Sequence, residues 1–233
     1  MESKVIPAEI RILNYGGKKR AYWLMKSKVI QELRKLYPSA KIALRHANPL
    51  QLLVAVMLSA QCTDKMVNRI TPALFAKYRT AKDFASADIR GLEGMVKSAG
   101  FYRTKAKHIK DACKIIVGKH GGKVPDTMEG LLELPGVARK TANIVLSNAY
   151  GKNEGIAVDT HVKRLAFRLG FTENSNPEKI EKDLMAAFPR SEWNKVTYLL
   201  IEHGRAICKA PVPLCSRCAL AGICPKNGVS KSK

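Results

Sequence analysis

The stretch from Leu50 to Ser59 places the strongest limit on how this chain can fold. Every residue from Leu52 to Leu58 is apolar, so a helix over this stretch has no polar face. Such a helix is stable only when other elements surround it on all sides. Pro49 suits its start, because the first turn of a helix does not use the N–H that proline lacks. The stretch therefore predicts a helix at the centre of a core.

The rest of the chain also carries helical signals. Thr63 or Asp64 can cap a helix that runs to about Tyr78, and Asp126 with Glu129 has the spacing of a capping box. Asn176-Pro177 has the order of a cap followed by proline in the first turn. We find no sustained alternation of apolar and polar residues, which a half-buried strand would need. The sequence predicts an all-α fold.

A tight turn leads into one of these helices within the stretch Leu134 to Ala142. Pro135 fixes φ and Gly136 allows a positive φ, so the backbone can reverse and point successive N–H groups outward. The helix from Lys140 to Ala149 adds the positive end of its dipole at the same place. The turn therefore predicts a phosphate site, with Arg139 and Lys140 as additional cations.

A shift of 36 residues relates this turn to an earlier one. It superposes Gly100 on Gly136, as well as Gly94 on Gly130, Arg103 on Arg139 and Ala106 on Ala142. Duplication and convergence of two basic helical turns explain four matches about equally well. Thr104 stands where the later turn has Lys140, so this kind of turn does not require a lysine.

The charge of the chain points to a polyanionic partner. Lys and Arg number 41 against 19 Asp and Glu, which gives a formal net charge of +22. The basic residues are spread along the whole chain, so the charge belongs to the folded body as well as to the basic arm from Met1 to Arg20. The alternative is that the charge serves solubility or non-specific adhesion to nucleic acid.

The N-terminus and the apolar runs bear on the compartment. Met1 to Lys26 lacks the continuous apolar core of a secretory signal, and no run approaches the ~18 residues of a membrane span. We expect an intracellular protein of the cytoplasm or nucleoid that is neither secreted nor in a membrane.

The cysteines are unevenly placed. Cys62 and Cys113 stand alone, whereas the other four lie close together near the C-terminus: Cys208, Cys215, Cys218 and Cys224. In an intracellular protein this clustering favours a metal over disulfides. Only Cys215 and Cys218 form a close pair, so the spacing by itself leaves a zinc site and an iron-sulfur cluster equally open.

Three motifs together resemble the endonuclease III family of helix-hairpin-helix DNA glycosylases. They are Leu134 to Ala142, then Val158-Asp159-Thr160-His161-Val162, then the pattern Cys-x6-Cys-x2-Cys-x5-Cys, and the likeness extends from about Pro49 to Cys224. The resemblance implies two helical lobes with DNA bound across the cleft between them. A six-helix barrel would span residues 46–154, with the hairpin at 127–149. Residues 1–45 and 155–233 would form the cluster lobe, with the cysteine loop at 208–224.

For catalysis, the resemblance implies roles for Lys140 and Asp159. Lysine at this motif position attacks C1′ of the sugar as a neutral amine, forms a Schiff base and cuts the strand by β-elimination. Without the resemblance, Lys140 reads as a phosphate-contacting cation. The family assigns its essential aspartate to the second motif, where a carboxylate can stabilise positive charge growing on the sugar. Capping of the following helix would by itself explain Asp159.

Further residues gain expected roles in the same way. The four clustered cysteines match the ligands of the family's [4Fe-4S] cluster. Gln61 matches a glutamine that fills the gap left by an extruded base, and Phe101 or Tyr102 lies where the family places a wedge against the opposite strand. The hairpin residues expected to contact DNA are Pro135, Gly136, Val137, Ala138 and Arg139.

Two departures from the family pattern affect the expected site. Ala138 stands where the family more often has a second glycine in the hairpin. The segment from Gly151 to Gly155 is slightly longer than in the family pattern. The second departure bears on how Asp159 is placed relative to Lys140. Both residues keep their identities.

The expected activity is a bifunctional glycosylase and abasic-site lyase that acts as a monomer on duplex DNA with damaged bases, oxidised pyrimidines foremost, or abasic sites. One alternative is a monofunctional mismatch glycosylase, although such relatives generally lack lysine at the position of Lys140. A non-catalytic helix-hairpin-helix protein with a structural metal is the other, and it would not need Asp159.

Overall fold

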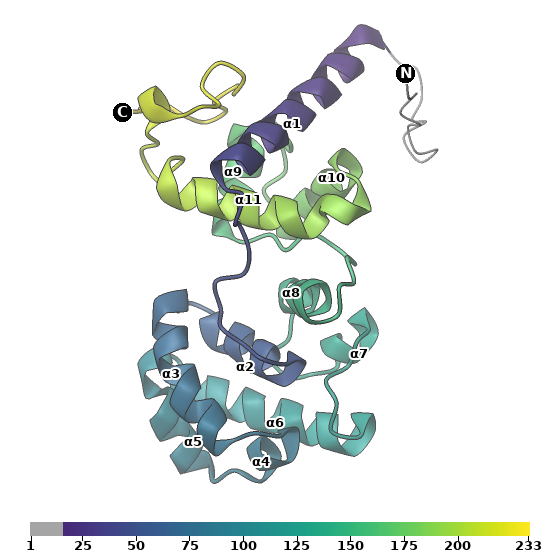
Figure 1. Ribbon diagram of the computed structural model, residues 1–233, viewed down its shortest axis with the longest axis vertical. Coiled ribbons are helices and arrows are strands. Elements are labelled where there is room, and N and C mark those ends of the chain that lie inside the picture. The colour runs from purple at the N-terminus through teal and green to yellow at the C-terminus, as the bar shows by residue number, and fades with distance from the viewer. Residues whose placement is uncertain (1–15) are drawn as a thin grey trace.

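The computed structural model describes the backbone of residues 16–233 and the side chains from Lys26 onward. Residues 1–15, which include most of the basic arm, lie outside the described residues. The described part is helical and has no strand, which confirms the all-α prediction (Figure 1). Its α-helices are α1 (Gly16–Leu36), α2 (Pro49–Ser59), α3 (Asp64–Lys77), α4 (Ala81–Ser86), α5 (Ile89–Val96), α6 (Tyr102–His120), α7 (Met128–Leu132), α8 (Arg139–Ala149), α9 (Thr160–Arg168), α10 (Pro177–Ala187) and α11 (Trp193–Ala206).

Two hydrophobic cores divide these helices into two lobes. The first core takes its buried residues from between Leu44 and Leu146, and it holds α2 to α8 together. The second combines residues of α1 with residues between Ile156 and Leu220, so both ends of the described chain build it. Figure 1 shows the lobes one above the other, with α8 facing the upper lobe. Division of the chain after residues 45 and 154 stays a prediction.

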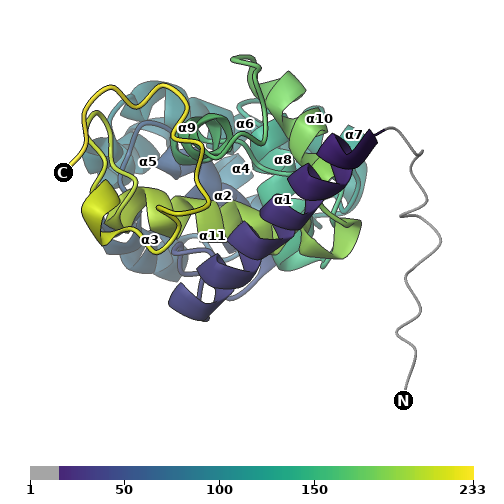
Figure 2. The same cartoon turned by 90° about the horizontal axis from the view of Figure 1, so that it is seen from above.

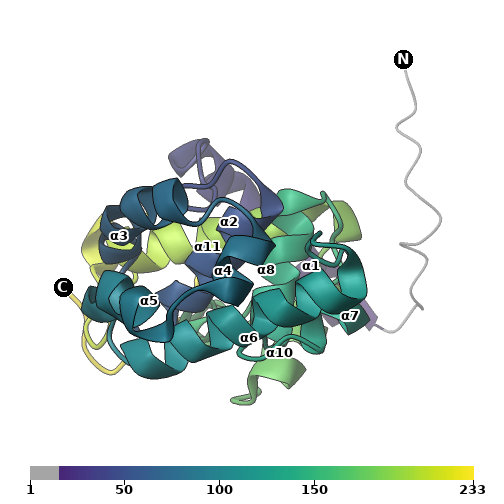
Figure 3. The same cartoon turned by 90° about the horizontal axis from the view of Figure 1, so that it is seen from below.

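Helix α2 occupies the centre of the first lobe, as its apolar sequence requires. Its residues from Leu52 to Leu58 are all buried. Asn48 caps the helix, because its side chain accepts a hydrogen bond from the Gln51 N–H. Helix α6 runs alongside α4 and α5 on the side of this lobe that faces away from the second lobe, as the view from below shows (Figure 3).

The second lobe is built around α9 and α11. Helix α1 lies across α11 at the end of the molecule (Figure 2). Its Val29, Ile30 and Leu33 are buried in the second core. The loop that carries the four clustered cysteines follows α11 and closes this end of the lobe (Figure 1).

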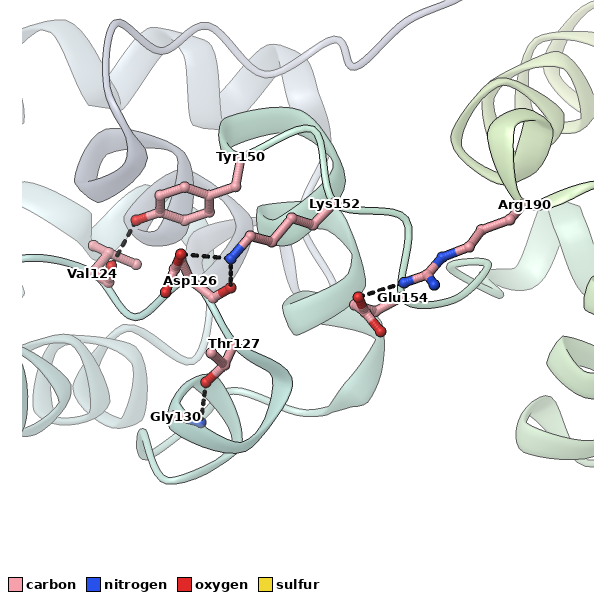
Figure 4. A network of polar contacts seen from close by, with 8 residues as sticks. All are labelled: Val124, Asp126, Thr127, Gly130, Tyr150, Lys152, Glu154 and Arg190. Carbon is pink, nitrogen blue, oxygen red and sulfur yellow. Dashed lines mark hydrogen bonds and ion pairs between the residues drawn. The ribbon is translucent and has the colours of Figure 1, made fainter.

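Most of the expected helix caps are present, but the capping box at Asp126 is wrong. Thr127 is the cap of α7, and its hydroxyl accepts from the Gly130 N–H at 3.2 Å (Figure 4). The Asp126 carboxylate binds the ammonium of Lys152 at 2.5 Å instead. A carboxylate one residue before the cap is free to pair with a cation, and Lys152 supplies it.

The slightly extended segment Gly151 to Gly155 is attached to both lobes. Lys152 also donates to the backbone oxygen of Asp126 at 2.8 Å, which joins the segment to the loop before α7. On the other side, Arg190 binds Glu154 at 2.6 Å and exchanges two hydrogen bonds with Asn153. Figure 4 shows the Lys152 side chain extending from this segment toward Asp126, while the Arg190 side chain reaches Glu154 from the opposite side. The extra length is thus held in place before the chain reaches Asp159.

None of the described helices is both long enough and apolar enough to cross a membrane.

Candidate active site and DNA interface

The hairpin turn adopts the backbone that its sequence predicts. Gly136 has φ +78°, where an added Cβ would lie 2.7 Å from Nδ1 of His108 on α6. A side chain at this position would therefore meet both backbone strain and a clash. The Val137 N–H donates to the Leu134 oxygen at 3.1 Å and its side chain is buried, so Val137 holds the turn together.

Two amides of the turn point to solvent. Gly136 and Ala138 are exposed, and their N–H groups have no hydrogen-bond partner among the described residues. Ala138 has φ −93°, an extended conformation that any residue adopts, so the missing second glycine does not alter the turn. Because α8 begins at the next residue, free N–H groups and a helix N-terminus coincide here. The turn has the features of a phosphate site.

Lys140 lies on the first turn of α8 and is exposed. Its neighbours Ala138 and Arg139 are exposed as well, so the start of α8 faces solvent. An exposed ammonium next to a phosphate site is accessible to a sugar of bound DNA.

Arg139 makes an ion pair with the neighbouring lobe. Its Nε donates at 2.8 Å to Glu181 on α10, and this hydrogen bond raises the pKa of the guanidinium. The Glu181 side chain is only 7% exposed and accepts a second hydrogen bond from Asn143 on α8. A Cβ on Gly155 would lie 1.9 Å from the same carboxylate. Glu181 therefore joins the start of α8, α10 and the segment that leads to Asp159.

Asp159 caps α9, as the sequence predicts. Its Oδ1 accepts from the Val162 N–H at 2.8 Å, whereas Oδ2 has no hydrogen-bond partner among the described residues. The side chain is half-buried, at the end of the extended segment between the lobes. One carboxylate oxygen thus fixes the orientation of the group and the other is available.

His161 and Arg164 occupy the next turn of α9. Burial lowers the pKa of His161, while the nearby Asp159 carboxylate opposes this effect. His161 Nδ1 lies 3.2 Å from Arg164, whose guanidinium also donates to the backbone oxygens of Cys208 and Gly204. Through Arg164, the helix that carries Asp159 is bound to the cysteine loop.

Gln61 and Phe101 lie on the same cavity. Its volume is about 210 Å³, and Gly136 of the hairpin and Lys105 of α6 also line it. Gln61 has φ +52° and Phe101 φ +46°, left-handed values that are uncommon for residues with side chains. The Phe101 side chain is 67% exposed. Two strained turns and the hairpin thus present their residues to a common space.

The four clustered cysteines line one pocket next to the C-terminal end of α11, together with Arg168, His203 and apolar side chains such as Leu214 and Leu220. Hydrogen-bond donors surround the sulfur atoms: Arg168 reaches Cys208 at 3.4 Å and the Lys226 N–H reaches Cys224 at 3.4 Å. Four thiols around an apolar pocket, with N–H groups directed at sulfur, form a donor set that fits an iron-sulfur cluster. Among the described residues, no group of three or more His, Cys, Asp or Glu side chains is arranged to hold a single metal ion.

Comparison with known proteins identifies the family. The model of the HhH-GPD superfamily of base excision DNA repair proteins matches residues 54–190. Endonuclease III of Synechocystis sp. is 51% identical over 204 residues, which cover 88% of this chain and 93% of that protein. The chain belongs to the endonuclease III family of base excision DNA repair proteins. The resemblance read from the three motifs is confirmed, and the protein is a DNA glycosylase and abasic-site lyase.

Solved structures of endonuclease III have the same fold. One is a non-covalent complex of endonuclease III with DNA, at 41% sequence identity and a TM-score of 0.82, covering 91% of this chain and 97% of that chain. Another is a trapped covalent intermediate of endonuclease III with DNA, with the same identity, TM-score and coverage. The match to these two structures extends over 91% of this chain, so the family assignment applies to nearly all of it.

Sequence reasoning missed Glu181 and Lys105. Neither residue belongs to a motif, and each makes a hydrogen bond to a partner that is distant in sequence. Glu181 lies 42 positions from Arg139, and Lys105 lies 47 positions from Leu58. The one available signal was a charged residue at an apolar position of an amphipathic helix.

Proposed function

We propose that this enzyme removes oxidised pyrimidines from duplex DNA and cuts the resulting abasic site through a Schiff base on Lys140. The observation that carries the proposal is the exposed Lys140 side chain on the first turn of α8, directly after a turn with free amides. Binding of a backbone phosphate at the turn would bring a sugar within reach of the amine.

The chemistry follows from the two catalytic residues. The neutral amine of Lys140 bonds to C1′ as the glycosidic bond breaks, and the base leaves with a proton. Opening of the sugar ring then gives the Schiff base. Loss of a proton from C2′ expels the 3′ phosphate and cuts the strand, and hydrolysis frees the amine.

Asp159 would act on the first of these steps. Its carboxylate, fixed by the Val162 N–H, would stabilise the positive charge that develops on the sugar as the base departs. In the proposed complex, Gln61 fills the space vacated by the extruded base and Phe101 is inserted as a wedge against the opposite strand. Because Glu181 binds Arg139, the N–H groups of Gly136 and Ala138 supply the main contacts of the hairpin with phosphate.

We propose that Cys208, Cys215, Cys218 and Cys224 hold a [4Fe-4S] cluster. When bound, it supplies structural support and takes no part in cutting the glycosidic bond. Lys209 and Arg217 lie between the ligands in sequence, and Arg205 and Lys226 flank them. This basic loop would lie against DNA. Measurement of the iron and zinc content of the purified protein tests this proposal, because only an iron-sulfur cluster contains iron. We also propose that the enzyme is a monomer of the cytoplasm or nucleoid.

Borohydride trapping on an abasic-site duplex tests the role of Lys140. We expect a covalent complex with the unmodified enzyme and with Lys119→Ala, which removes an exposed lysine paired with Glu133, but none with Lys140→Ala. Failure of the unmodified enzyme to form the complex would exclude the lyase mechanism and leave a monofunctional glycosylase or a non-catalytic protein.

Asp159→Asn separates capping from catalysis. Asparagine caps a helix about as well as aspartate, so the stability of α9 is retained. We expect removal of a damaged base to slow by about 10²-fold or more, while cutting of a preformed abasic site slows much less. Equal slowing of both steps would contradict the proposed role in breaking the glycosidic bond.

A further inference from the structure

Lys105 is a buried lysine that the chemistry above does not use. It lies near the start of α6 and is 6% exposed, and burial lowers its pKa. Among the described residues, no carboxylate lies within ion-pair distance of its ammonium. A buried charge without a counter-ion is costly, so its hydrogen bonds must compensate for the lost hydration.

The two hydrogen bonds of Lys105 go to the ends of two different helices. Its Nζ donates at 2.8 Å to the backbone oxygen of Leu58, near the end of α2, and at 2.8 Å to that of Ala99, which ends the short 3₁₀ helix Lys97–Ala99. Backbone oxygens at helix ends lack partners within their own helix and carry the negative end of its dipole. One ammonium therefore joins two chain segments that are far apart in sequence.

Each of these segments continues directly into a strained residue of the DNA interface. Gln61 follows Leu58 by three residues, and Phe101 follows Ala99 by two. Both residues have left-handed backbones, which persist only where the surrounding structure holds them. The Lys105 side chain also lines the cavity that Gln61 and Phe101 share.

We infer that Lys105 is a positioning residue that couples the gap-filling turn at Gln61 to the wedge turn at Phe101. It fixes both turns relative to each other before DNA binds, so Gln61 and Phe101 enter the duplex as one unit. This inference rests on the proposed roles of Gln61 and Phe101. It assigns Lys105 no contact with DNA.

The test compares affinity for a duplex with a stable abasic-site analogue and for the same duplex without it. We expect Lys105→Met to lower the ratio of the two affinities about tenfold, because the displaced Gln61 and Phe101 side chains lose part of their contact with the neighbouring bases. Affinity for the intact duplex stays unchanged, since the lost ammonium touches no phosphate. A ratio that does not fall, or an equal loss for both duplexes, would overturn the inference.

Lys110→Met is the matched control. Lys110 lies on the same helix and donates at 2.6 Å to the backbone oxygen of Ala87, which ends α4 away from the cavity. We expect this variant to keep the ratio of the unmodified enzyme. A similar fall in both variants would assign the effect to general loosening of α6 and overturn the inference.

A further variant separates coupling from a general loss of structure. In an enzyme that already carries Gln61→Ala and Phe101→Ala, Lys105→Met is expected to lower the ratio no further, because the side chains it positions are gone. A further fall would show that Lys105 acts elsewhere. If Lys105→Met does not fold, Lys105→Gln replaces it: its amide is one bond shorter and cannot hold both oxygens at 2.8 Å. We then expect a fall of about threefold, and an unchanged ratio overturns the inference.

The outcome also distinguishes this inference from the proposed function. If the unmodified enzyme does not prefer the abasic-site analogue, the proposed gap-filling itself is wrong. If the unmodified enzyme prefers the analogue and Lys105→Met does so equally, only the role of Lys105 is wrong.

Discussion

Truncation of Glu181 to alanine should show how strongly the two lobes are joined at the active site. The change removes the acceptor for the Arg139 guanidinium and for the Asn143 amide, both at 2.8 Å. A buried donor left without a partner costs about 2 kcal/mol. The Arg139 side chain is 43% exposed and can be hydrated, so its lost ion pair adds only about 1 kcal/mol. We expect the free energy of unfolding to fall by about 3 kcal/mol.

A double-mutant cycle with Arg139→Ala isolates the ion pair. Measured by urea denaturation, the coupling energy between Arg139 and Glu181 should be about 1 kcal/mol. Lys119 and Glu133 provide the control cycle, because their side chains are 65% and 50% exposed at a similar distance of 3.0 Å. Their coupling should be clearly weaker, because solvent screens both exposed charges. Equal coupling energies in the two cycles would refute the argument that burial of Glu181 strengthens its pair.

Two other predictions concern the hairpin and the isolated cysteines. Gly136→Ala should destabilise the protein by about 1–2 kcal/mol, because the positive φ at this position is unfavourable for alanine, and it should weaken DNA binding. The control is Gly94→Ala, where nothing lies within 4 Å of the new Cβ, and it should stabilise α5 by about 0.5–1 kcal/mol. Urea denaturation measures both, and an unaffected Gly136→Ala would contradict the strain argument. Burial raises the pKa of Cys113 to about 12, so iodoacetamide at pH 8 should alkylate the half-buried Cys62 and leave Cys113 unmodified. Mass spectrometry of the folded protein checks this, and rapid labelling of Cys113 would show that the first core opens.

Local features of the sequence determined much of this structure. The apolar run of α2, the turn at Gly136 and the cap at Asp159 each depend on a few neighbouring residues, and each is found where the sequence predicts it. The family motifs added the fold of the lobes.

The contacts between distant segments could not be predicted in this way. At the sequence level Arg139 reads as a free cation of the hairpin, because its partner Glu181 lies in another lobe. Lys105 differs from the other lysines of α6 by its position on the buried face of that helix, but this position does not indicate which backbone oxygens it contacts. The exposure of Lys140 also depends on how α8 is placed between the lobes, which neighbouring residues do not specify.

The origin of the second core from both chain ends has a consequence for synthesis on the ribosome. The first core uses residues up to Leu146, so the lobe with the hairpin and Lys140 is complete while the rest of the chain is still being made. Helix α1 is made earlier, yet its buried face finds its partners only among residues 156–220. The nascent chain therefore presents the hairpin and Lys140 before Asp159 and the cysteine loop exist. In the proposed mechanism, the phosphate site and the amine are therefore assembled before the carboxylate and the cluster, and until then α1 has an uncovered apolar surface.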